Sequence, residues 1–162
     1  MADLTVLESK VGEVLGLAMA AQAVTEKVGK LVEDGALKRT LERMKKEAAE
    51  TEKRCTTLAA SFDGKKTAIL EKAREVKGEA TEMMRTYLGN DADGLDGFEF
   101  LTMAEAGEVG HWQIVDTLNR KARNRDLQKI IDWVTPIQAR HLKDTMAGSL
   151  KLAAQEDPND EA

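Results

Sequence analysis

The sequence has few of the residues that build sheets, disulfide frameworks or membrane spans. Its 162 residues include one cysteine, two prolines, one tyrosine and three phenylalanines. A single cysteine excludes an intramolecular disulfide framework and a cysteine cage for zinc. The scarcity of aromatic residues disfavours a sheet-rich fold. No apolar run approaches the ~20 residues of a membrane-spanning helix, and the N-terminus lacks the pattern of a secretion signal. We therefore expect a cytoplasmic protein without a membrane segment.

Charge is abundant but mixed in sign. The chain has 24 lysines and arginines against 29 aspartates and glutamates, for a formal net charge of −5. The basic runs at residues 38–46 and 120–125 are interleaved with or flanked by acidic residues, which is typical of a solvated helix face. We expect no nucleic-acid partner, because such proteins gather their basic residues into a patch.

Apolar residues at intervals of three and four predict four long helices, at residues 4–33, 37–62, 98–123 and 126–154, with Asp34-Gly35 ending the first. A weaker pattern at residues 65–88 predicts one additional helix. The first and last connections between long helices are short, while the middle one takes more than thirty residues. We expect one domain over residues 1–154, an all-α four-helix bundle with one long crossover containing the additional helix, which is the topology of ferritin-like folds. Residues 155–162 are expected to form a flexible acidic tail.

The only two histidines occupy matching positions. One ends the run Glu108-Val-Gly-His111, and the other ends the run Gln138-Ala-Arg-His141. Three residues span about one helical turn, so each histidine shares a helix face with its polar partner. Each pair also interrupts an otherwise apolar stripe. This placement predicts a buried polar layer at one level of the last two long helices, where a bundle would hold a metal.

The first two long helices offer further polar residues at the same level. Glu47 and Glu50 lie one turn apart on the second helix, and Gln22 lies on the first. Carboxylates and imidazoles suit iron, manganese or zinc. The candidate metal ligands are therefore Glu47, Glu50, Glu108, His111, Gln138 and His141.

Each candidate also has an ordinary structural explanation. A histidine on an apolar face is most often a hydrogen-bonded core residue, and Glu47 and Glu50 lie in a highly charged segment typical of a solvated face. Gln22 could be a hydrogen-bonding partner with no metal role. Glu105 lies one turn before Glu108, and the spacing leaves open which of the two faces the core.

Three segments together resemble the ferritin-like superfamily, particularly its small bacterial rubrerythrin-like and stress-associated members. Residues 46–51 (Lys-Glu-Ala-Ala-Glu-Thr) resemble the second core helix. Residues 104–112 (Ala-Glu-Ala-Gly-Glu-Val-Gly-His-Trp) resemble the third, and residues 133–142 resemble the fourth. The resemblance implies a di-iron carboxylate site inside the bundle, with oxidase or peroxide chemistry. The family pattern has a Glu-x-x-His pair on each of two helices.

This chain departs from that pattern at three positions. Gln22 and Gln138 stand where the first and fourth helices would carry a glutamate, and Glu50 stands where the second would carry a histidine. Lost negative charge weakens the binding of two cations. The alternative hypothesis is therefore a metal-free structural or stress-response bundle whose site is vestigial. An adaptor for partner helices is a third hypothesis, and a homodimer is expected under the first two.

Overall fold

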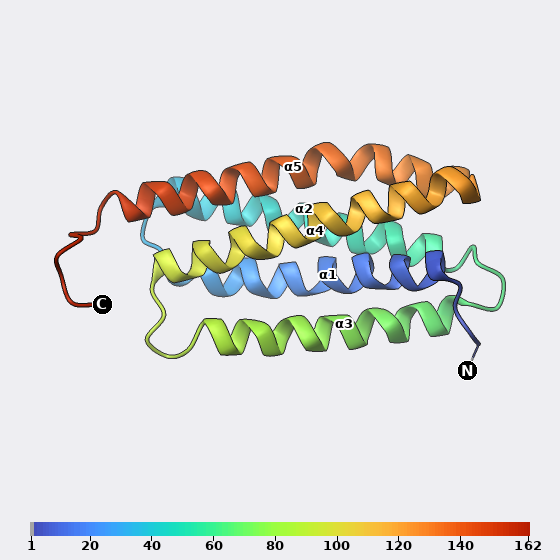
Figure 1. Cartoon of the computed structure of the whole chain (residues 1–162), viewed down its shortest axis with the longest axis horizontal. Coiled ribbons are helices and arrows are strands. Elements are labelled where there is room, and N and C mark those ends of the chain that lie inside the picture. The colour runs from blue at the N-terminus through green and yellow to red at the C-terminus, as the bar shows by residue number, and fades with distance from the viewer. Residues whose placement is uncertain (1) are drawn as a thin grey trace.

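The structure, a computed structural model, describes residues 2–162 and is built from α-helices, with no strand in that range (Figure 1). The prediction of an all-α fold is thus confirmed. No helix within residues 2–162 has the length and apolar character that crossing a membrane requires. The five helices are α1 (Val6–Gly29), α2 (Gly35–Ala59), α3 (Lys66–Tyr87), α4 (Gly94–Ala122) and α5 (Arg125–Ala153).

Side-chain caps set the starts of four of these helices, and α3 begins without one. Thr5 begins α1 with a capping box, in which its hydroxyl accepts from the Glu8 amide and its own amide donates to the Glu8 carboxylate. Asp34 caps α2. Asp93 forms a second capping box with Asp96, so α4 begins at Gly94, four residues earlier than the apolar pattern predicts. Such caps satisfy amide groups that have no partner within the helix.

Four of the helices pack as two hairpins against each other. Helix α1 packs against α2, and α4 packs against α5; the pairs meet through α1 with α4 and α2 with α5. Helix α3 occupies the long connection and runs back along the outside of α1, so α2 and α4 point the same way (Figure 1). The long connection and the additional helix are therefore both present.

Helix α3 packs tightly on α1 and only slightly on α4. The close approach to α1 occurs at Gly16, where an added Cβ would lie 2.4 Å from the carbonyl oxygen of Ala73. Only a residue without a side chain fits at that distance. Because α3 follows α1 rather than the seam between α1 and α4, space remains beside α4 on that side of the bundle.

The apolar core is divided into two clusters along the bundle. One lies around Val14, Cys55, Val115 and Ile131, and the other surrounds Val28 together with residues of α2 and the start of α4. Between the clusters, each long helix carries polar residues in its buried stripe. These buried polar residues are Thr25, Thr51, Glu105, Glu108, Gln138, His141 and Thr145. The division places polar groups near the middle of the bundle.

Candidate functional site

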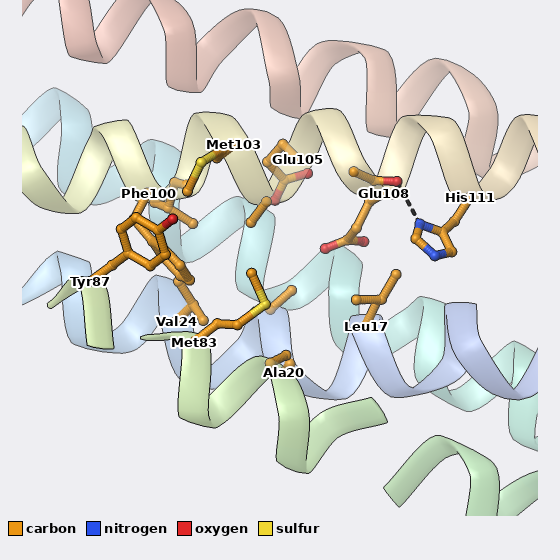
Figure 2. Close-up of a pocket in the computed structure, with 15 residues that line it drawn as sticks. Leu17, Ala20, Val24, Met83, Tyr87, Phe100, Met103, Glu105, Glu108 and His111 are labelled. Carbon is orange, nitrogen blue, oxygen red and sulfur yellow. Dashed lines mark hydrogen bonds between the residues drawn. The ribbon is translucent and has the colours of Figure 1, made fainter. Parts of the chain in front are cut away.

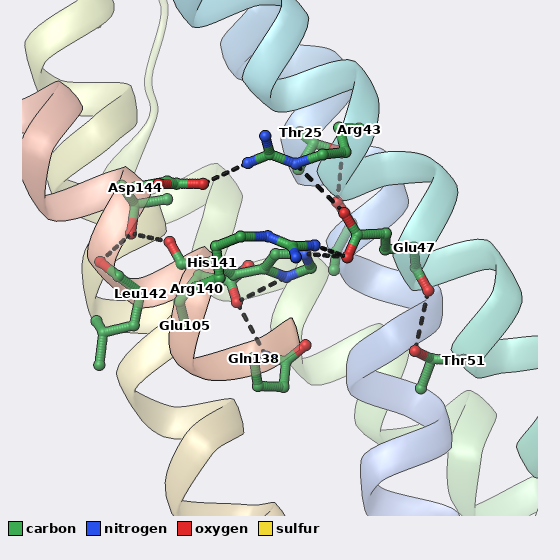
Figure 3. Close-up of polar contacts among 12 residues, drawn as sticks. Thr25, Arg43, Glu47, Thr51, Glu105, Gln138, Arg140, His141, Leu142 and Asp144 are labelled. Atoms are coloured by element: carbon green, nitrogen blue, oxygen red, sulfur yellow. Dashed lines mark hydrogen bonds and ion pairs between the residues drawn. The ribbon is translucent and has the colours of Figure 1, made fainter. Parts of the chain in front are cut away.

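The predicted buried polar layer exists where α4 and α5 face each other. We use "polar layer" for Glu47, Glu105, Glu108, Gln138 and His141. The last four are buried, and the Glu47 carboxylate reaches them from α2 with its side chain 17% exposed. Figure 3 shows the side chains of Glu47, Glu105, Gln138 and His141 converging from three helices. Helical spacing accounts for this convergence, since residues three or four apart share a face.

His141 lies between two carboxylates of different helices. Its Nδ1 is 3.5 Å from Oε2 of Glu105 on α4, and its Nε2 is 3.5 Å from Oε2 of Glu47 on α2. The side chain is 3% exposed, and Nε2 has no hydrogen-bond partner in the described part of the chain. A proton on each ring nitrogen would let the imidazole donate toward both carboxylates. His141 on α5 therefore contacts both α2 and α4.

Glu105 completes the contact between α4 and α5. The side-chain amide of Gln138 donates to Oε2 of Glu105 over 3.0 Å, the oxygen that also faces His141. The sequence left open whether Glu105 or Glu108 faces the core, and the structure buries both. Two residues one turn apart differ by only about 60° around the helix axis, so a broad buried face can include both. Glu105 belongs to the polar layer but was not among the six ligands predicted from the sequence.

The Glu47 carboxylate is held by two arginines in addition to its contact with His141. Arg43, one turn earlier on α2, places Nε 3.3 Å from Glu47 Oε1. Arg140 on α5 pairs with Glu47 Oε2, and Arg43 also pairs with Asp144 on α5 (Figure 3). Two guanidinium groups offset the charge of this carboxylate and oppose a cation beside it.

Glu108 has no such compensation. Its carboxyl is buried and makes no side-chain hydrogen bond with residues 2–162. Burial, with the neighbouring charge of Glu105 as a second cause, raises the pKa of Glu108 well above its ordinary value of 4.5. Desolvation and a nearby like charge both disfavour the ionised form of a carboxyl group. The layer thus holds one carboxyl group that the protein itself leaves unpaired.

His111 is not part of the polar layer, and its expected inward position is wrong. Its side chain is 37% exposed, with Nδ1 donating to the Gly107 carbonyl oxygen at 2.8 Å and Nε2 lying 3.5 Å from Oε2 of Glu13 on α1. Trp112, four residues after Glu108, takes the inward position. One residue turns the helix by about 100°, which moves His111 to the edge of the buried face.

Two other candidates also lie outside the layer. Glu50 is 40% exposed and pairs with Arg54, with Oε1 2.9 Å from Nε, as expected for a solvated face. Gln22 on α1 donates to the carbonyl oxygen of Ala18 and to the carboxylate of Glu52 on α2. Gln22 is therefore a hydrogen-bonding partner between α1 and α2, which was the alternative to a role at a metal site. Of the six predicted ligands, the structure brings together Glu47, Gln138 and His141 around Glu105, while Glu108 is buried beside Glu105 and lines a cavity next to α1.

The described residues contain no group of three or more histidine, cysteine, aspartate or glutamate side chains arranged to hold a metal ion. The donor set explains the poor fit to a two-metal centre. The two nitrogens of His141 point to opposite sides, and the carboxylate on one side is already held by arginines. Di-iron sites of helical bundles use four carboxylates and two histidines, whereas this layer holds three carboxylates and one histidine.

Comparison with known proteins does not identify a family. No protein-family model matches the chain, and neither the curated proteins nor the solved structures give a match.

Proposed function

We propose that this protein is a structural or stress-response bundle of ferritin-like ancestry in which the carboxylate–histidine layer joins the helices rather than performing redox chemistry. One observation carries the proposal. Arg43 and Arg140 hold the carboxylate of Glu47, the residue that a metal centre would need as a ligand from α2. A carboxylate that pairs with two guanidinium groups has much less attraction left for a metal cation.

The geometry also gives the layer a structural role. His141 and Gln138 connect α5 with α4 through Glu105, and His141 and Arg140 connect α5 with α2 through Glu47. Buried polar groups can set the register of packed helices, because a shift along the axis would leave them unpaired. In this protein the layer would fix how far α5 slides against its two neighbours.

A second function, binding of iron or of manganese or zinc, is supported by a different part of the layer. Glu105 and Glu108 bring two buried carboxyl groups close together, and His141 Nδ1 lies 3.5 Å from Glu105. The three side chains are not arranged as a metal site in the structure, so this function requires Glu108 to turn toward Glu105 and His141; a single cation held there would supply the oxidase or peroxide chemistry expected from the resemblance. Their carboxylate and imidazole groups are suitable donors for these metals.

Metal analysis and thermal unfolding of one set of proteins separate the two functions. The wild type and His141→Ala are incubated with ferrous iron, manganese or zinc, desalted and measured by elemental analysis. The structural function predicts less than about 0.1 metal ion per chain in both proteins and no rise in melting temperature with metal. Near-stoichiometric metal in the wild type that disappears in His141→Ala would support the second function instead, since a ligand that binds only the folded state stabilises it.

The proposal includes a cytoplasmic location and a homodimer. The homodimer rests on the amphipathic surface that residues 65–88 leave over. Sedimentation equilibrium tests the dimer. A monomer at micromolar concentration would contradict the proposed homodimer.

A further inference from the structure

A cavity of about 260 Å³ lies between α1, α3 and α4, outside the contacts that join the polar layer. It exists because α3 packs on α1 and barely reaches α4. The walls are apolar and come from all three helices (Figure 2). They include Leu17 and Val24 from α1, Met83 and Tyr87 from α3, and Phe100 and Met103 from α4.

The rim of this cavity exposes large apolar side chains to solvent. Met83 is 53% exposed, Tyr87 is 56% exposed and Met103 is 47% exposed. Tyr87 and Phe100 close one end, with ring centroids 5.7 Å apart. Clustered apolar side chains around an opening often mark a binding site, and methionine adapts readily to the shape of a ligand.

The polar wall of the cavity is acidic. Glu105 and Glu108 line it, and Figure 2 shows the Glu108 carboxyl extending from α4 toward α1. Glu105 already has Gln138 and His141 as partners, whereas Glu108 has no hydrogen-bonding partner within residues 2–162. His111 lies at the same wall, but its Nε2 faces Glu13.

Charge therefore distinguishes among ligands of similar shape. No lysine or arginine is among the described side chains that line the cavity, so an anionic head group would find no cation to pair with, and the one histidine there already faces Glu13. A neutral molecule would fill the apolar part and leave Glu108 unpaired. An ammonium group would supply the missing partner, and a buried carboxylate gains most from an opposite charge that also donates hydrogen bonds.

We propose that this cavity binds a small primary amine with an apolar tail, the ammonium group pairing with Glu108 and the tail lying between α1 and α3. Size sets the tail length. An apolar cavity of about 150 Å³ accommodates benzene, so the space here suits a ligand of roughly ten non-hydrogen atoms. The site shares Glu105 with the polar layer, but its test measures ligand binding at Glu108, whereas the proposed function is tested by metal content.

The test compares three ligands that differ only in the head group: octylamine, octan-1-ol and octanoate. Binding to the full chain is measured by calorimetry at pH 7 and mapped through the methyl resonances of methionine. We expect octylamine to bind most tightly and octanoate least. Octylamine should shift the methyl signals of Met83 and Met103 at the rim and leave Met146 on α5, which lies outside the cavity, unchanged.

Two matched variants show whether Glu108 is responsible. Glu108→Gln keeps the shape of the side chain and removes its charge, so it should weaken octylamine binding about tenfold or more and leave octan-1-ol almost unchanged. Glu79→Gln removes the same charge from an exposed position on α3 and should change neither ligand. Ala20→Leu, which fills part of the cavity from α1, should weaken all binding without depending on Glu108.

Several results would overturn the proposal. Absence of binding by octylamine, or tighter binding of octan-1-ol or octanoate by the wild type, would show that the cavity does not select an amine. An equal loss in Glu79→Gln and Glu108→Gln would show attraction to the net charge alone. Methyl shifts that include Met146 but not Met83 would place the ligand elsewhere.

Discussion

Nδ1 of His141 on α5 lies 3.5 Å from the Oε2 atom of Glu105 on α4, with both side chains almost completely buried. Glu105 was not among the predicted ligands, yet it is the partner that fixes the imidazole. The same ring reaches Glu47 on α2 with its other nitrogen. One side chain thus meets two carboxylates of two different helices.

The two histidines should differ in their effect on stability. Replacement of His141 by alanine removes the buried side chain between Glu105 and Glu47, and leaving a buried polar group without its partner costs about 1–3 kcal/mol. His111→Ala removes a half-exposed pair with Glu13, for which about 0–1 kcal/mol is expected. Urea unfolding of both variants gives the two values, and equal losses would contradict the structural role of His141.

Glu108→Gln should stabilise the protein as the pH rises. The pKa of Glu108 is raised in the folded state from an ordinary value of 4.5, so the folded chain holds a proton that the unfolded chain releases. Stability contributed by this group is complete below pH 4.5 and is lost as the pH rises through the folded pKa. Glutamine does not titrate and keeps a similar shape.

The measurement is the free energy of unfolding of the wild type and Glu108→Gln between pH 4 and pH 9, without added amine. The variant should match the wild type near pH 4 and exceed it increasingly above pH 4.5, until the difference becomes constant. A gain of the order of 1 kcal/mol is typical for a single substitution. If the difference in free energy of unfolding between the two proteins does not change with pH, the raised pKa of Glu108 is not its cause.

Cys55 should be unreactive in the folded protein. It is fully buried in the apolar cluster around Val14, and burial raises the pKa of its thiol to about 12. Thiol reagents attack the thiolate, which is therefore almost absent at pH 8. Labelling with a disulfide reagent should be at least ~10³-fold slower in buffer than in 8 M urea, given a typical folding equilibrium. Rapid labelling of the folded chain would show that this end of the bundle opens readily.

Two glycines on the packed pair α1 and α3 should respond oppositely to alanine. A Cβ at Gly16 would lie 2.4 Å from the carbonyl oxygen of Ala73, so Gly16→Ala must push α3 away at a cost of about 1–3 kcal/mol. Gly78 on α3 has no heavy atom within 4 Å of an added Cβ, so Gly78→Ala should stabilise the helix by up to ~1 kcal/mol. Thermal unfolding compares them, and a neutral Gly16→Ala would contradict the close packing of α3.

Much of the helix pattern could be predicted from local sequence because it depends on local causes. Periodic apolar residues predicted all five helices, and the gaps between the apolar stripes marked their separations. The start of α4 was placed too late, because the capping box of Asp93 and Asp96 extends the helix beyond its apolar stripe. Spacing also predicted the level of the buried polar layer, since Glu105, Glu108, Gln138 and His141 follow the same intervals as the apolar residues around them.

The sequence by itself thus determined the helical class, the order and length of the helices and the height of the polar layer, because these follow from helical periodicity and capping. The tertiary structure decided which polar side chains meet. His111 faces Glu13, Arg140 reaches Glu47 from another helix, and Glu108 is left at the wall of a cavity. Helical periodicity fixes the direction of a side chain around the helix axis only to within about 100°. Its partners depend on how distant helices rotate and pack, and here on α3 following α1.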